Sequence, residues 1–173
     1  MVQIKLKGFL LNQASGNIVM ALQEVEGQQR IFGVNVMAHD AFFISYAANG
    51  QVPPRPLTHD FAKSLFMLAG TKVAKIIFND VDEESRMIYA SVYVVGPNQK
   101  EEREVDCHPV DAVALAVRLG TPESPYPLFV AETVLDKYAT SKKSEKPPTD
   151  EELNRIEEEF KRFIRDGGQT GQA

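Results

Sequence analysis

Two short polar blocks in this chain combine the residue types that bind phosphate, hold metal ions and move protons. The first block is Arg-Pro-Leu-Thr-His-Asp at residues 55–60, and the second block is Asp-Cys-His-Pro-Val-Asp at residues 106–111. Carboxylates bind divalent cations, histidine exchanges protons near neutral pH, and arginine pairs with phosphate. If the two blocks meet in the fold, they predict a site for metal-assisted hydrolysis of a phosphodiester.

Each side chain of the two blocks has a role that suits its chemistry in such a site. Asp60 and Asp111 would hold Mg²⁺ or Mn²⁺, with Asp106 as a further candidate ligand. His59 would orient or deprotonate the attacking water. The candidates for contacts with the substrate phosphate are Arg55, Thr58 and His108.

Both blocks lie where a helix is expected to begin. Thr58 is a good N-cap before the apolar-periodic residues Phe61, Leu65 and Leu68. Pro109 suits the first helical position, directly before the run 110–119. Free backbone N–H groups at these helix starts favour anions. The same positions also suit ordinary caps, so Asp60 and Asp111 have a purely structural interpretation, and His59 has one as a hydrogen-bonded ring of the fold.

Asp111 is distinctive because it is the only ionisable residue between Pro109 and Arg118 in an otherwise apolar helix. This pattern predicts a buried carboxylate that needs a partner. Arg55 is a plausible partner, either paired with a carboxylate or directed at phosphate.

These residues carry a family resemblance. The stretch 55–138 resembles the bifunctional nuclease domain, which has an Arg-Pro-Leu-Thr-His-Asp block followed downstream by Asp-x-Arg-Pro-Ser-Asp-Ala at the start of an alanine-rich helix. The first block matches without change, and the second block matches at Asp106, Pro109, Asp111 and Ala112. The resemblance extends over most of residues 1–140. It implies cleavage of DNA and RNA, and relatives of this family look dimeric.

Two departures from the family pattern affect the expected chemistry. His108 stands where the family usually has arginine, and Val110 stands where it usually has serine. Histidine carries a positive charge only when it is protonated, so this replacement would weaken phosphate binding near neutral pH. If that arginine matters for activity in relatives, this protein is a poor or inactive nuclease.

The charge of the chain also argues against tight binding of nucleic acid. Residues 1–140 contain 12 Lys and Arg against 16 Asp and Glu, a balance of −4, whereas non-specific nucleic-acid binding normally depends on a basic surface. Binding of nucleic acid should therefore be weak and metal-dependent. The alternative is a catalytically inactive, dimeric interaction module of the same fold.

The order of the expected elements indicates an α+β fold. Alternating or β-branched segments predict strands near residues 2–6, 18–22, 30–36, 72–81, 87–95, 101–107 and 128–130, and helices are expected over 40–48, 61–68, 110–119 and 132–138. Several consecutive strands read as hairpins. The prediction is a mixed, largely antiparallel sheet with helices packed on it.

Three segments follow from composition: a domain over 1–140, a flexible linker over 141–148 and a charged amphipathic helix within 149–173. In the last segment, Leu153, Ile156, Phe160 and Phe163 form a narrow apolar stripe that would dock on the domain, on a second copy or on a protein partner. This stripe, the edge-like strand 101–107 and the apolar run 42–44 predict a homodimer or higher homo-oligomer.

The remaining features suggest a cytoplasmic protein. The N-terminus alternates like a strand and lacks the apolar core of a secretory signal, and no apolar run is long enough to span a membrane. A single cysteine, Cys107, fits a reducing compartment and is expected to be a small buried hydrophobe at a strand end.

Overall fold

The computed structural model describes residues 1–11, 16–82, 84–85, 87–121 and 124–139. The predicted linker and charged C-terminal helix lie outside these described residues. Seven strands form one sheet: β1 (Val2–Leu11), β2 (Ile18–Glu24), β3 (Ile31–Val36), β4 (Lys72–Val81), β5 (Ile88–Val95), β6 (Arg103–Cys107) and β7 (Leu128–Val130). The helices are α1 (Ala38–Ala48), α2 (Thr58–Leu68), α3 (Pro109–Leu119) and α4 (Glu132–Tyr138).

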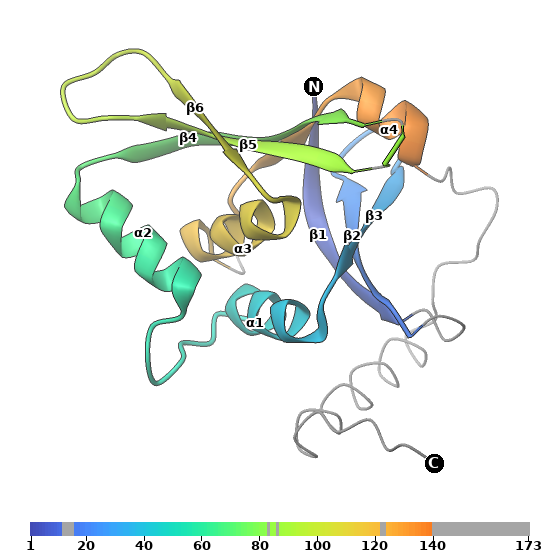
Figure 1. Cartoon of the computed structure of the whole chain (residues 1–173), viewed down its shortest axis with the longest axis horizontal. Helices are drawn as coiled ribbons and strands as arrows, with labels where there is room; N and C mark the ends of the chain where they lie inside the picture. The colour runs from blue at the N-terminus through green and yellow to red at the C-terminus, as the bar shows by residue number, and fades with distance from the viewer. Residues whose placement is uncertain (12–15, 83, 86, 122–123, 140–173) are drawn as a thin grey trace.

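The sheet is mixed and largely antiparallel, which confirms the expected α+β class. Its strand order is β3-β2-β1-β7-β4-β5-β6, and only the β4–β7 pair is parallel (Figure 1). The predicted hairpins are present as the β1–β2 and β4–β5 pairs. Strand β6 is the outermost strand next to β5, as expected for the edge-like segment.

Helix α3 is central because it packs between α1 and α2 and also contacts the sheet (Figure 1). Its residues from Pro109 to Ala116 are buried except Asp111, since small and branched apolar side chains cover nearly its whole circumference. They join a core formed by the inward residues of the strands, among them Phe32 and Phe78, whose rings meet edge to face at 5.7 Å. The most buried helix thus delivers the second block to the surface.

Helix α2 differs from the other helices because none of its residues is buried. Phe61, Leu65, Met67 and Leu68 are each about half or more exposed, although Phe66 packs partly against the core. The helix stops before Gly70, whose φ of +64° gives the left-handed conformation that glycine adopts readily after a helix end. The N-terminal end of α2 carries most of the first polar block, and the rest of the helix leaves an apolar face uncovered.

No helix among the described residues is long and apolar enough to cross a membrane.

Candidate functional site

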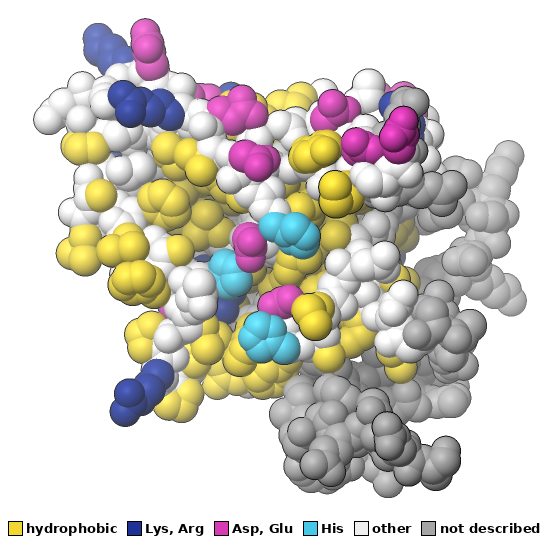
Figure 2. All heavy atoms as spheres, viewed as in Figure 1, with side chains coloured by type: hydrophobic (Ala, Val, Ile, Leu, Met, Phe, Trp, Pro, Cys, Tyr) yellow, Lys and Arg dark blue, Asp and Glu magenta, His cyan; other side chains and the backbone are white. Residues whose placement is uncertain are grey.

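The N-termini of three helices supply the histidine and aspartate residues of the site. In each of α1, α2 and α3 the third helical residue is an aspartate: Asp40, Asp60 and Asp111. In α1 and α2 a histidine directly precedes it, and in α3 the histidine is the N-cap residue. Figure 2 shows the histidine side chains gathered with acidic side chains in the middle of one face. The fold thus brings together residues that lie far apart in the sequence.

The two polar blocks meet directly through His59 and Asp111. His59 Nε2 lies 2.9 Å from Asp111 Oδ1, at hydrogen-bond distance across 52 residues of sequence. The histidine side chain is 23% exposed and the carboxylate is 58% exposed. The expectation that Asp111 is buried is therefore wrong. The neighbouring residues of the first turn of α3 are buried, but the Asp111 side chain points out of the core, where His59 from α2 meets it.

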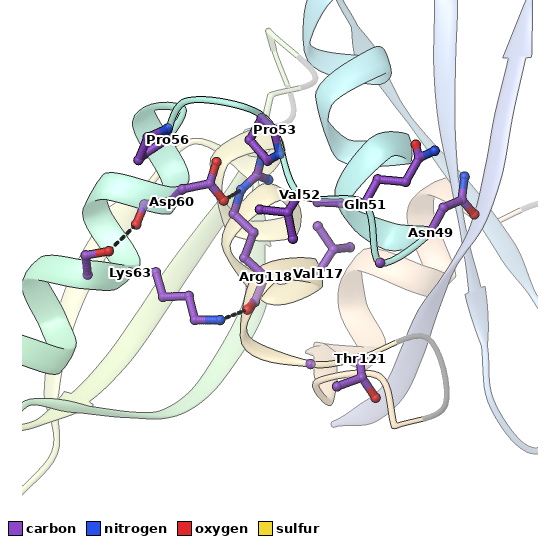
Figure 3. A pocket seen from close by; sticks show the side chains of 14 residues that line it. Asn49, Gln51, Val52, Pro53, Pro56, Asp60, Lys63, Val117, Arg118 and Thr121 are labelled. Atoms are coloured by element: carbon purple, nitrogen blue, oxygen red, sulfur yellow. Dashed lines mark hydrogen bonds and ion pairs between the residues drawn. The ribbon is translucent and has the colours of Figure 1, made fainter.

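Asp60 forms an ion pair with Arg118. Asp60 Oδ1 accepts a hydrogen bond of 2.8 Å from Arg118 Nε (Figure 3). Asp60 Oδ2 accepts a hydrogen bond of 2.9 Å from the backbone N–H of Leu57. Leu57 is the N-cap residue of α2, and Thr58 is its first helical residue. The expectation that Thr58 is the N-cap is wrong, because the carboxylate of Asp60 satisfies the backbone at this helix start instead.

Arg118 is the important residue that the sequence analysis missed. Its side chain is only 4% exposed, and its guanidinium also donates to the carbonyls of Ala114 at 2.8 Å and Phe43 at 3.4 Å. Its own carbonyl accepts a hydrogen bond from Lys63 Nζ. Arg118 therefore connects α1, α2 and α3. The available signal was an arginine at the end of an apolar helix, where burial demands a carboxylate partner.

Arg55 does not take the role of carboxylate partner. It is exposed, and within the described part of the chain it forms no ion pair or hydrogen bond. Its guanidinium therefore stays available for a phosphate, but the structure gives the pairing function to Arg118. Arg55 was expected as the partner of Asp111, but the partner of Asp111 in the structure is His59, which lies 52 residues away in the sequence.

His108 serves as the N-cap residue of α3. Its Nδ1 accepts a hydrogen bond of 3.3 Å from the backbone N–H of Val110, and Pro109 occupies the first helical position as expected. The imidazole is exposed. Because Nδ1 is an acceptor in this arrangement, a proton on the ring would reside on Nε2. A contact between His108 and phosphate stays a prediction.

Asp106 and Cys107 complete the second block at the end of β6. Asp106 is exposed and pairs in register with Ser91 of β5. Cys107 is partly buried against the core, as expected for a small apolar residue. Burial raises the pKa of the Cys107 thiol to about 11, and the negative charges of Asp111 and Asp106 add to the shift. Both carboxylates therefore lie close enough to act on this thiol.

This shift predicts that Cys107 is a slow nucleophile. At pH 8 a thiol with a pKa of about 11 is deprotonated in roughly one molecule in a thousand, so alkylation should run about 100-fold slower than for an unperturbed cysteine. The measurement is the rate of iodoacetamide labelling of folded protein at pH 8, with urea-unfolded protein as control. Equal rates in the two states would contradict the expected protection.

A pocket lies beside α2, next to Asp60. It has a volume of about 650 Å³, within the range of small-molecule sites, and its lining includes Asp60, Lys63, Arg118 and residues of the segment between α1 and α2 (Figure 3). The Asp60–Arg118 pair forms part of its wall. This pocket adjoins the second helical turn of α2.

The carboxylates of the site do not form a ready-made metal centre. Among the described residues, no three His, Cys, Asp or Glu side chains are grouped so that they could hold a metal ion. Asp60 and Asp111 have different partners, Arg118 and His59 respectively. A divalent ion shared by Asp60 and Asp111 therefore stays a prediction that would require rearrangement of these pairs.

A family model provides the class of the protein. The model of the bifunctional nuclease domain matches residues 20–143, which include all three helix N-termini of the site. This chain belongs to the bifunctional nuclease domain family.

Two similar proteins come from Mycobacterium tuberculosis. They are "Uncharacterized protein Rv1829" from strain H37Rv and "Uncharacterized protein MT1877" from strain CDC 1551. Each is 30% identical to this chain over 135 residues, which cover 78% of this chain and 74% of the relative. The similarity therefore extends over most of the domain that carries the site.

Proposed function

We propose that this domain hydrolyses phosphodiester bonds of DNA or RNA, with His59 as the base that activates water. The observation that carries the proposal is the 2.9 Å contact between His59 Nε2 and Asp111 Oδ1, which joins the two polar blocks. A carboxylate that accepts from one imidazole nitrogen fixes the ring orientation and the tautomer and stabilises the protonated ring. The other nitrogen, Nδ1, makes no hydrogen bond within the described part of the chain and is the atom that would take the proton.

The remaining residues of the blocks suit phosphate binding. Thr58 offers a hydroxyl, Arg55 an exposed guanidinium and His108 an exposed imidazole. The positive ends of the α2 and α3 helix dipoles favour an anion next to the His59–Asp111 pair. Asp60 has a positioning role in this proposal, because it holds the α2 N-terminus through Leu57 and ties α2 to α3 through Arg118.

A divalent ion would supply charge neutralisation at the substrate phosphate. This contribution matters here because the domain carries excess negative charge and would repel a nucleic-acid backbone. Asp111, with its exposed carboxylate, is the residue best placed to contact such an ion, with Asp60 and Asp106 as further candidates. The proton-transfer role of the His59–Asp111 pair does not depend on the ion.

The proposal predicts nuclease activity that depends on Mg²⁺ or Mn²⁺. Purified full-length protein should cleave fluorescent single-stranded DNA or RNA when either metal is added in excess over phosphate. A chelator should stop cleavage, and activity should fall steeply with added salt because few basic residues hold the substrate. A His59→Ala preparation made in parallel controls for contaminating nucleases. Absence of cleavage by wild-type protein with either metal would favour the inactive interaction module.

Self-association is the second part of the proposal, and α2 is its best candidate surface. Phe61, Leu65 and Leu68, spaced by four and three residues, form an apolar stripe that the described domain leaves 58%, 49% and 85% exposed. Such a stripe suits a second copy of the same helix across a twofold axis. Of the earlier candidates, β6 is an edge strand, whereas Ile44 is buried in the core and cannot contribute.

A charge placed in this stripe should break the dimer. Leu65→Glu puts an ionised side chain on the proposed interface and should convert wild-type dimer to monomer, with a dissociation constant raised by at least about 100-fold. Light scattering after gel filtration measures the mass. Met87→Glu, at an equally exposed apolar position on the β4–β5 connection, is the matched control and should stay dimeric. Wild-type protein that is monomeric at all concentrations would refute the proposal.

A further inference from the structure

A second histidine–aspartate pair lies beside the proposed site, on the N-terminus of α1. His39 Nδ1 is 2.9 Å from Asp40 Oδ1, and the His39 ring packs edge to face on Phe43 with centroids 5.0 Å apart. His39 was not among the site residues expected from the sequence. In the fold, however, its ring is held by a carboxylate on one nitrogen and an aromatic ring on its flank. Within the described part of the chain Nε2 makes no hydrogen bond.

His59 and the His39–Asp40 pair border one small cavity. This cavity has a volume of about 70 Å³, and its lining includes His39, Asp40, Phe43, Thr58 and His59. It is roughly twice the ~30 Å³ that a water molecule occupies in the liquid, so it admits a group of a few heavy atoms. Helix α1 thus contributes to the site from a third, separate element of the fold.

The lining of this cavity favours a proton donor for the leaving group. No lysine or arginine is among the described residues that line it. When a phosphodiester is cleaved, the departing oxygen gains negative charge, and a proton from a nearby side chain neutralises that charge directly. His39 is the imidazole of the lining that the His59–Asp111 pair leaves unused.

We propose that His39, oriented by Asp40, is the general acid of the phosphodiester cleavage in which His59 is the base. This inference rests on the proposed function. His59 removes a proton from water, the water oxygen forms a bond to phosphorus, and the bond from phosphorus to the leaving oxygen breaks. His39 gives its proton to that oxygen, so the products are a phosphomonoester and an alcohol. Solvent then returns a proton to His39 and accepts one from His59.

The leaving group provides the test, because a good leaving group needs no proton. Full-length wild-type protein, His39→Ala and His59→Ala are assayed on a single-stranded DNA oligonucleotide and on bis(4-nitrophenyl) phosphate, whose nitrophenolate departs unprotonated. His39→Ala should lose about 100-fold or more in kcat on the oligonucleotide and about threefold or less on the nitrophenyl ester. His59→Ala should lose activity on both substrates, since both need an activated water.

Asp40→Asn is the conservative companion variant, because it keeps the shape of the pair and removes the charge that orients His39. It should show a smaller loss than His39→Ala with the same dependence on the substrate. His39 is 74% exposed, so its replacement leaves the core intact. Equal losses of His39→Ala on both substrates, or no loss on either, would overturn this inference and leave the proposed function standing. Wild-type protein that cleaves neither substrate would overturn both.

Discussion

His59→Ala should reduce phosphodiester cleavage by about 100- to 10,000-fold, the range typical for loss of a general base. Asp111→Asn should reduce it by about 100-fold, because the amide no longer stabilises the protonated ring that His59 forms during the reaction. The 2.9 Å contact between the two side chains is the reason to expect a shared effect. Initial rates on a fluorescent oligonucleotide, measured at saturating substrate, give kcat for each variant.

The two effects should not be additive. Residues that act as a unit lose most of their contribution when either is removed, so the double variant should be little slower than His59→Ala alone. Asp80→Asn is a suitable control, because Asp80 is exposed and its carboxylate accepts a hydrogen bond from the adjacent backbone N–H of Val81. The Asp111→Asn protein should keep the thermal midpoint of the wild-type protein, because the Asp111 side chain is 58% exposed. Full activity of His59→Ala would contradict the assignment.

Arg118→Met should cause the largest loss of stability. The substitution keeps an aliphatic stem in the core but removes the hydrogen bonds to Asp60, Ala114 and Phe43, and it leaves the Asp60 carboxylate without its cation. Breaking a buried pair from one side costs about 3 kcal/mol or more. Urea unfolding followed by circular dichroism measures this free energy.

Arg55→Met is the matched control for this prediction. Both residues are arginines, but Arg55, the partner expected from the sequence, is exposed and has no ion pair within the described part of the chain. Its replacement should change the free energy of unfolding by less than about 0.5 kcal/mol. A double variant, Asp60→Asn with Arg118→Met, should recover part of the stability because it removes the uncompensated charge. Equal free energies of unfolding for Arg118→Met and Arg55→Met would contradict the role assigned to Arg118.

The sequence predicted the elements of the fold because its patterns are local. Strand β3 alternates between buried and outward residues, and α3 begins at Pro109, as the periodicity and the helix-start residues indicated. The distinction between a hairpin-rich mixed sheet and a parallel sheet also followed from the order of the elements. These features depend on neighbours within a few residues, so composition and spacing determine them.

The partners of the charged residues could not be predicted, because they depend on how separate helices pack. Asp111 lies in an apolar stretch of buried residues, yet its own side chain is exposed and meets His59 of α2. Asp60 pairs with Arg118, and Asp111 pairs with His59 instead of Arg55, because the packing of α2 against α3 brings these side chains together. His39 was not among the site residues expected from the sequence. Its position beside Thr58 and His59 is defined by the packing of α1 against α3, which has no signature in the local sequence.

A phosphodiester should bind where the helix N-termini bring the histidines together. The chain contains three histidines, so the proton NMR spectrum of their Cε1–H groups has three signals, which single variants assign. The measurement is a titration of full-length protein with a non-hydrolysable phosphorothioate dinucleotide. The signals of His59 and His39 should shift together with one dissociation constant, while a protein carrying Asp111→Asn should show a weakened or altered shift of His59. Signals that stay unchanged at ligand concentrations that inhibit cleavage would place the site elsewhere and contradict the account.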